Sequence, residues 1–152
     1  MGAGKTCVGR LLAERLSMPF VDLDQRIEER EGVTVPVIFA ERGEAAFRKA
    51  ERDALEAVLN REPCVLACGG GTPCQPGAME KLLAWGHTIF LDVSWQELSG
   101  RDLVGRPLWG AGAEKLLAQR RPVYQQAHIC LDASQEVPQV VEAALACLEL
   151  RA

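Results

Sequence analysis

The chain begins with Met-Gly-Ala-Gly-Lys-Thr-Cys, which has the glycines, lysine and hydroxyl residue typical of a phosphate-binding loop. Gly2 and Gly4 would let the backbone approach a polyphosphate, and Lys5 would reach its terminal phosphates. Thr6 would offer its hydroxyl oxygen to Mg²⁺, and a helix starting here would direct its free N–H groups at the negative charge. The stretch therefore predicts nucleotide binding, with a disordered Gly/Ala-rich segment as the alternative.

This phosphate-binding pattern is incomplete at its front. The motif G-x-x-x-x-G-K-[ST] needs an earlier glycine, and that position would precede Met1. The strand that delivers such a loop would precede Met1 as well. We therefore expect translation to start further upstream, with Met1 as an internal methionine, and we expect the chain as written to lack a stabilising strand.

A pair of carboxylates follows a short apolar run in Phe20-Val-Asp-Leu-Asp24. We expect a strand over 20–24 that places Asp22 and Asp24 on the same side of its end. One carboxylate would suit the water shell of a metal ion, and the other would suit a position beside the acceptor hydroxyl of a kinase substrate. The alternative is that Asp24 caps the following helix, and the two roles can coexist.

Three further features could bind an anion or a ligand. Gly69-Gly70-Gly71 follows a buried apolar run, where consecutive glycines cost conformational entropy unless a ligand must touch the backbone. Arg106 and Arg120 carry planar guanidinium groups, which suit carboxylates and phosphates. Arg48 and Glu51 are three residues apart on a predicted helix, so by themselves they indicate an ordinary surface pair.

Helix and strand patterns alternate along the chain. Strands are predicted over 20–24, 64–67, 87–93 and 129–132, and helices over 5–16, 25–31, 34–41, 44–59, 78–84, 95–99, 113–126 and 137–150. Strands separated by helices predict an α/β fold with a parallel sheet and helices on both faces. Ligands of such sheets bind at the carboxyl ends of the strands, so the phosphate loop, the two aspartates and the triple glycine should share one crevice.

Composition excludes several other classes of protein. The 152 residues suit a single domain over 1–152, and a net charge of −4 argues against a general nucleic-acid binder. The sequence has no apolar run of the roughly 20 residues that a membrane span needs. Its six cysteines form no C-x-x-C pair, which argues against a zinc site and favours reduced thiols in the cytoplasm.

Taken in order, these motifs resemble those of the shikimate kinases. The resemblance rests on Met1–Thr6, Phe20–Asp24, Phe47-Arg48-x-x-Glu51, Gly69–Gly71, Arg106-Pro-Leu and Arg120-x-Pro-x-Tyr124. It implies a three-layer P-loop NTPase fold of the nucleoside-monophosphate-kinase type, with a mobile lid at about 100–112. It also implies transfer of the γ-phosphoryl group of ATP to the 3-hydroxyl of shikimate, with Mg²⁺ as cofactor, in aromatic amino-acid biosynthesis.

The resemblance also implies a role for individual residues. The catalytic residues would be Lys5, Asp24 and Arg106, and ATP would contact Gly2, Ala3, Gly4, Lys5, Thr6, Cys7 and Arg106. Shikimate would contact Asp24, Arg48, Gly70 and Arg120, whereas Thr6 and, through water, Asp22 would hold Mg²⁺. The family points to a cytoplasmic monomer without nucleic-acid or membrane partners.

Two departures and two alternatives qualify this resemblance. Cys7 and Cys68 stand where the family more often has hydroxyl residues, and a thiol is a weaker donor to phosphate. One alternative is a P-loop kinase of another small polyol or sugar acid. The other is a non-catalytic domain with a kinase-like fold, which the incomplete loop would allow.

Overall fold

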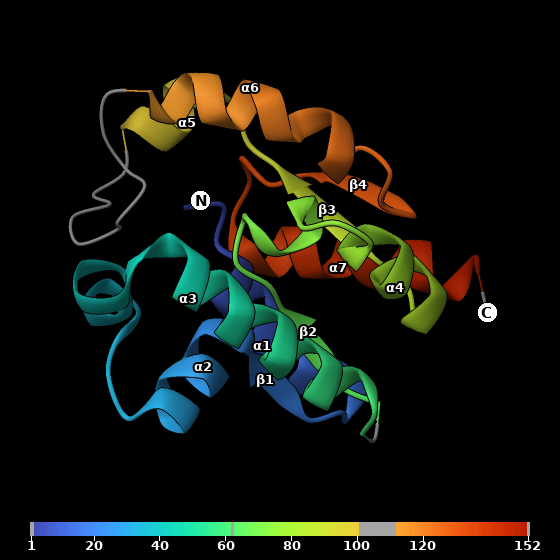
Figure 1. Ribbon diagram of the computed structural model, residues 1–152. Coiled ribbons are helices and arrows are strands. Elements are labelled where there is room, and N and C mark those ends of the chain that lie inside the picture. The colour runs from blue at the N-terminus through green and yellow to red at the C-terminus, as the bar shows by residue number, and fades with distance from the viewer. Residues whose placement is uncertain (1, 62, 101–111, 152) are drawn as a thin grey trace.

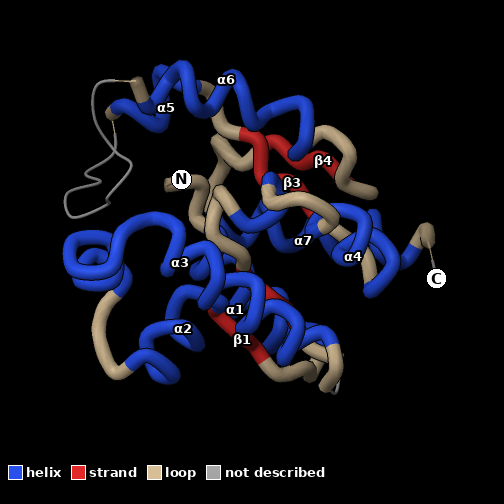
Figure 2. The backbone as a smooth tube through the Cα atoms, viewed as in Figure 1, coloured by secondary structure: helices blue, strands red, loops and turns tan. Residues whose placement is uncertain are grey.

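The computed structural model describes residues 2–61, 63–100 and 112–151 (Figures 1 and 2). The elements, in chain order, are α1 (Lys5–Leu16), β1 (Phe20–Asp22), α2 (Leu23–Glu31), α3 (Val35–Leu59), β2 (Val65–Ala67), the 3₁₀ turn η1 (Thr72–Cys74), α4 (Ala78–Trp85), β3 (Ile89–Asp92), α5 (Trp95–Ser99), α6 (Ala113–Tyr124), β4 (Ile129–Asp132) and α7 (Val137–Glu149). None of the helices in this part of the chain is both long and apolar enough to cross a membrane.

The strands form two parallel pairs. β1 lies beside β2, with Val21 opposite Leu66, and β3 lies beside β4, with Leu91 opposite Leu131. Helices connect the strands of each pair, as parallel pairing requires. The predicted alternation of helices and parallel strands is therefore confirmed.

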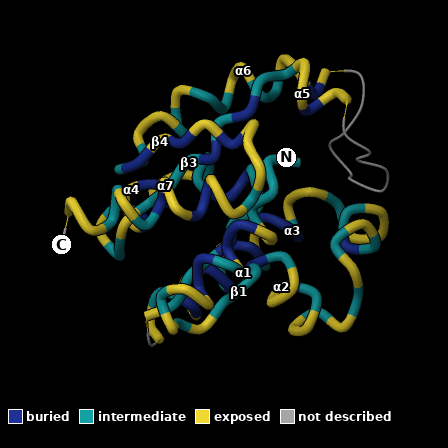
Figure 3. Tube along the Cα trace, turned by 180° about the vertical axis from the view of Figure 1, so that it is seen from behind, coloured by how far each residue is buried: buried dark blue, intermediate teal, exposed yellow. Residues whose placement is uncertain are grey.

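Two apolar clusters lie on opposite faces of the strands. Val65 of β2 packs against the cluster that α1 and α7 build around Leu12 and Val141. The next residue, Leu66, packs against the cluster that α2, α3 and α4 build around Ile27. Because successive side chains of a strand point to opposite faces, helices cover both faces, which gives the expected three layers. Figure 3 shows the buried residues gathered on the inner sides of these helices.

The N-terminal end of the chain lies between two groups of helices. Figure 1 shows α2 and α3 on one side and α5 and α6 on the other, with the N-terminal end of the chain between them, and Figure 3 shows the same arrangement from behind. The residues that precede α1 therefore lie between these two groups of helices (Figures 1 and 3).

A glycine divides α3 into two helical parts. Gly43 has φ 78° and ψ 172°, which interrupts the helix between Val35 and Leu59. A positive φ of this size strongly favours glycine, because a Cβ atom would be strained there. The two helices predicted on either side of Gly43 are therefore confirmed, and the second of them carries Arg48 and Glu51.

The structure corrects the prediction for Asp22 and Asp24. The strand ends at Asp22, whose Oδ1 accepts hydrogen bonds from the backbone N–H groups of Asp24 at 3.1 Å and Gln25 at 3.5 Å. Asp22 is thus the N-cap of α2, and Asp24 lies in its first turn. The strand expected over 20–24 and the alternative in which Asp24 caps the helix are both wrong, because capping by Asp22 starts the helix two residues earlier.

An apolar cavity of about 460 Å³ separates the two strand pairs. Its walls include the facing strands, β2 with Val65 and Leu66 and β3 with Ile89 and Phe90. Ala3, just before α1, also lines it. The cavity therefore lies where an additional strand would fit between β2 and β3, and its walls suit apolar side chains. Such a strand would join the two pairs into one sheet.

This cavity generates a stability prediction. An N-terminal extension by one apolar strand-forming segment and a loop glycine should raise the Tm and tighten ATP binding. Each Val- or Ile-sized side chain that enters the cavity contributes roughly 1.5–3 kcal/mol, which is large beside the stability of a whole domain. Calorimetry and ATP titration check this against a Gly/Ser extension of equal length, and equal Tm values for the two proteins would contradict the prediction.

Candidate active site

The phosphate-loop residues lead directly into α1. Gly4 has φ 80° and precedes the helix as its N-cap, while Gly2 has φ 67°. The Gly4 carbonyl accepts the first intrahelical hydrogen bond, from Val8 N at 2.9 Å. Lys5 is the first helical residue, so its side chain lies at the same end of α1 as the N–H groups of the first turn, which have no acceptor within the helix. Such a helix start attracts anions.

Thr6 and Asp22 form a pair of oxygen ligands beside this helix start. Thr6 Oγ1 donates a hydrogen bond to Asp22 Oδ2 at 2.9 Å. In the part of the chain that the structure describes, no group of three His, Cys, Asp or Glu residues could hold a metal ion. Mg²⁺ prefers one or two protein oxygens together with phosphates and water, so this hydroxyl–carboxylate pair fits Mg²⁺ bound to a nucleotide.

Asp24 lies next to the same group. Burial raises the pKa of its carboxyl group, repulsion from Asp22 and Glu51 raises it further, and Lys5 opposes these effects. The carboxylate also lies against the glycine turn, because a Cβ atom added to Gly69 would come within 3.1 Å of Asp24 Oδ1. A side chain at Gly69 would therefore crowd the Asp24 carboxylate, which would have to yield by a few tenths of an ångström.

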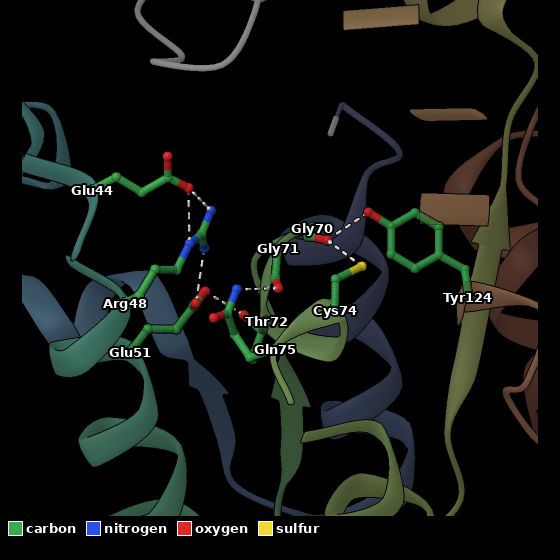
Figure 4. A network of polar contacts seen from close by, with 9 residues as sticks. All are labelled: Glu44, Arg48, Glu51, Gly70, Gly71, Thr72, Cys74, Gln75 and Tyr124. Carbon is green, nitrogen blue, oxygen red and sulfur yellow. Dashed lines mark hydrogen bonds and ion pairs between the residues drawn. The ribbon is translucent and has the colours of Figure 1, made fainter. Parts of the chain in front are cut away.

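Arg48 is buried in a network of carboxylates (Figure 4). Its Nη1 donates to Glu51 Oε2 at 2.9 Å, and its Nε and Nη2 donate to Glu44 Oε1 at 3.2 and 3.0 Å. Glu51 is only 1% exposed, and its other oxygen accepts a hydrogen bond from Thr72 Oγ1 at 2.7 Å. The interpretation of Arg48 and Glu51 as a surface pair is therefore wrong, because η1 packs over this part of α3.

The glycine turn places Asp24 and Arg48 close together. A Cβ atom at Gly71 would lie 2.5 Å from Arg48 Nη1, so a side chain there would displace the guanidinium group. Two residues earlier, a Cβ atom added to Gly69 would make a less severe contact with Asp24 Oδ1, at 3.1 Å. The sequence analysis assigned the close approach at the triple glycine to a ligand, and in the structure the side chains of Asp24 and Arg48 approach the backbone there.

Arg120 and Arg121 have different surroundings. Arg121 forms an ion pair with Asp92 at the end of β3. Arg120 lies near Cys74 and Tyr124, where its charge partly offsets the effect of burial, which raises the pKa of both groups. Arg48 acts on the same two groups. The structure thus brings Arg48 and Arg120 to the same side chains, although α3 and α6 are far apart in the sequence.

The structure adds residues that the sequence analysis did not assign to the site. Thr72 is buried against Glu51, and Tyr124 donates a hydrogen bond to the Gly70 carbonyl oxygen. Glu51 and Tyr124 belong to the motifs quoted for the resemblance, whereas nothing in the sequence around Thr72 indicates its buried role. Arg106 and most of the expected lid lie outside the described residues.

Comparison with known proteins identifies the family. The family model described as shikimate kinase matches residues 1–149. The chain belongs to the shikimate kinase family. A shikimate kinase of Sulfurihydrogenibium sp. is 39% identical over 99% of this chain and 95% of its own length. One of Parabacteroides distasonis is 44% identical over 88% of this chain and 83% of its own length.

Solved shikimate kinases share the fold as well. The crystal structure of the Aquifex aeolicus enzyme has a TM-score of 0.89 at 34% identity and covers 98% of this chain and 92% of its own. The Acinetobacter baumannii enzyme, solved in complex with shikimate, has a TM-score of 0.90 at 34% identity, with 99% and 89% covered. A gluconokinase from Sinorhizobium meliloti, with a TM-score of 0.64 at 21% identity, shares the fold alone. The predicted P-loop NTPase-like fold is therefore confirmed.

The cysteines provide a test of where the phosphate site lies. Cys7, in the first turn of α1, and Cys130, on β4, are both exposed, whereas burial raises the pKa of Cys68 to about 12. Iodoacetamide at pH 8 should therefore modify Cys7 and Cys130 but not Cys68. MgATP should slow the modification of Cys7 alone, as peptide mass mapping can measure. Equal protection of Cys7 and Cys130, or none at Cys7, would remove Cys7 from the nucleotide site.

Proposed function

We propose that this protein transfers the γ-phosphoryl group of ATP to the 3-hydroxyl of shikimate. Family membership supports the reaction, and the arrangement around the glycine turn supports the substrate. Asp24 and Arg48 contact this turn two residues apart, at Gly69 and Gly71. A small acid that also carries hydroxyl groups can therefore reach a carboxylate base with one end and guanidinium groups with the other.

Nucleotide binding is assigned to the start of α1. Gly2, Ala3, Gly4 and Cys7 line the loop and first turn, and their backbone N–H groups would contact phosphate oxygens. Lys5 would neutralise charge on the terminal phosphates. Thr6 and, through water, Asp22 would hold Mg²⁺, which supplies charge neutralisation at the phosphate oxygens when bound.

Phosphoryl transfer needs an oriented hydroxyl and an acceptor for its proton. Asp24 would accept a hydrogen bond from the substrate hydroxyl and take its proton as the oxygen attacks the γ-phosphorus. The bond from the γ-phosphorus to the bridging oxygen of ATP then breaks, and ADP leaves with that electron pair. Lys5 would stabilise the charge that develops on the phosphoryl oxygens during this step.

Substrate selection is assigned to the guanidinium groups of Arg48 and Arg120. Arg48 and Arg120 would hold the carboxylate of shikimate, each through charge-assisted hydrogen bonds, and the backbone at Gly70 would support the same group. Arg106, in a lid at about 100–112, would close over ATP and neutralise charge during transfer. We further propose a single domain over 1–152 that acts as a cytoplasmic monomer.

The assignment of Arg120 is tested against its neighbour. Arg120→Ala should raise the KM for shikimate roughly 10- to 100-fold, because it removes a hydrogen bond to a charged group. The KM for ATP should stay unchanged. Arg121→Ala is the matched control, since Arg121 pairs with Asp92, and it should leave the KM for shikimate nearly unchanged.

A coupled ADP-release assay with shikimate, quinate and gluconate measures these values and tests the proposed function. Wild-type preference for another acid would reject shikimate as the substrate, and equal effects of the two variants would reject the carboxylate role of Arg120.

Arg48→Ala is a poorer probe of the carboxylate site than Arg120→Ala. It leaves the Glu51 carboxylate buried without its cationic partner, which costs about 3–5 kcal/mol of folding stability.

Asp24 and Asp22 should differ in their effect on turnover. Asp24→Asn should lower kcat strongly, because an amide cannot accept the proton, whereas Asp22→Asn retains a good N-cap and should mainly raise the Mg²⁺ concentration required. Because the pKa of Asp24 is raised above 3.8, activity should be lost on acidification at a higher pH than an ordinary aspartate would give. Steady-state kinetics against pH and Mg²⁺ check both statements. An unchanged kcat in Asp24→Asn would exclude Asp24 as the base.

A further inference from the structure

Tyr124 connects α6 to the glycine turn. It lies four residues after Arg120 on α6, and residues at this spacing share one face of a helix. Its hydroxyl donates a hydrogen bond to the Gly70 carbonyl oxygen at 2.5 Å, and Cys74 Sγ makes a longer contact of 3.9 Å with the same oxygen. The helix that carries Arg120 is therefore fastened to the turn that contacts Arg48.

The hydroxyl of Tyr124 is a fixed donor. Burial raises its pKa to about 12, with nearby Arg120 and Arg48 opposing this effect, so the group stays protonated at physiological pH. Its ring lies 5.3 Å from the ring of Phe90 on β3, measured between centroids. Phe90 on β3 thus packs against the Tyr124 ring, while the Tyr124 hydroxyl binds the Gly70 carbonyl oxygen of the turn.

The hydrogen bond to Gly70 also sets the direction of the next N–H group. The Gly70 carbonyl and the Gly71 N–H belong to one planar peptide unit, and in a trans unit they point in opposite directions. Figure 4 shows Tyr124 on one side of the turn and Arg48 on the other. With the carbonyl held by Tyr124, the Gly71 N–H points away from Tyr124, toward the side on which Arg48 lies.

We propose that Tyr124 is a positioning residue for the substrate carboxylate. Its hydroxyl holds the Gly70–Gly71 peptide so that the Gly71 N–H faces the space beside Arg48, and it fixes the distance between Arg48 and Arg120. The carboxylate would then meet a backbone N–H as well as two guanidinium groups. This proposal rests on the function proposed above, and it goes further by assigning a tyrosine that need not contact the substrate.

Tyr124→Phe is the decisive variant, because it removes only the hydroxyl and keeps the ring against Phe90. The KM for shikimate should rise about 5- to 10-fold, because the variant loses the hydrogen bond of the hydroxyl to Gly70 and its interaction with Arg120. The kcat and the KM for ATP should change by less than about twofold, and the Tm should change little, because the ring packing remains. Cys74→Ala is the matched control at the same oxygen, and it should leave the KM for shikimate within about twofold because a long thiol contact is weak.

A neutral substrate distinguishes a role of Tyr124 in carboxylate binding from a general loss of order in the site. Shikimate methyl ester has no carboxylate, so wild type and Tyr124→Phe should have similar KM values for it. An unchanged KM for shikimate in Tyr124→Phe, an equal effect of Cys74→Ala, or an equal rise with the ester would each overturn the positioning role. Wild type that fails to phosphorylate shikimate would instead reject the proposed function itself, and the role of Tyr124 with it.

Discussion

The ion pair between Arg48 and Glu51 is the contact around which the site is organised. Glu51 is almost completely buried, so its charge must be balanced by Arg48 and its second oxygen satisfied by Thr72. Removing one partner of such a pair is far more costly than forming a surface pair is favourable. The second part of α3 and the η1 turn are therefore held in one relative position, and Arg48 has little freedom to move before a substrate arrives.

The glycine turn lacks side chains, so the rigidly held Arg48 can lie directly beside its backbone. Gly69 and Gly71 admit Asp24 and Arg48 to the backbone, so two groups of opposite charge stand beside one short segment. In this position the pKa of Asp24 is raised by burial and by neighbouring carboxylates, while Lys5 opposes these effects. A carboxyl group whose proton affinity is raised in this way is a better proton acceptor than an exposed aspartate.

Sequence patterns were sufficient for the order of elements, the parallel strands and the break at Gly43, because periodicity and glycine are local signals. They failed at Asp22 and Asp24, where a side-chain cap decides between strand and helix within two residues. They also failed at Arg48 and Glu51. Spacing on a helix does not reveal that Thr72, 21 residues further along the chain from Glu51, covers the pair.

The break at Gly43 has a consequence for how the chain tolerates insertions and deletions. Each residue inserted into a continuous helix rotates everything beyond it by about 100°, which would turn Arg48 out of the site. Because Gly43 uncouples the helical phase, a change of length between Val35 and Gly43 can be absorbed before Arg48 is reached. Length variation among homologues should therefore fall before Gly43, and the interval from Gly43 to Glu51 should be constant.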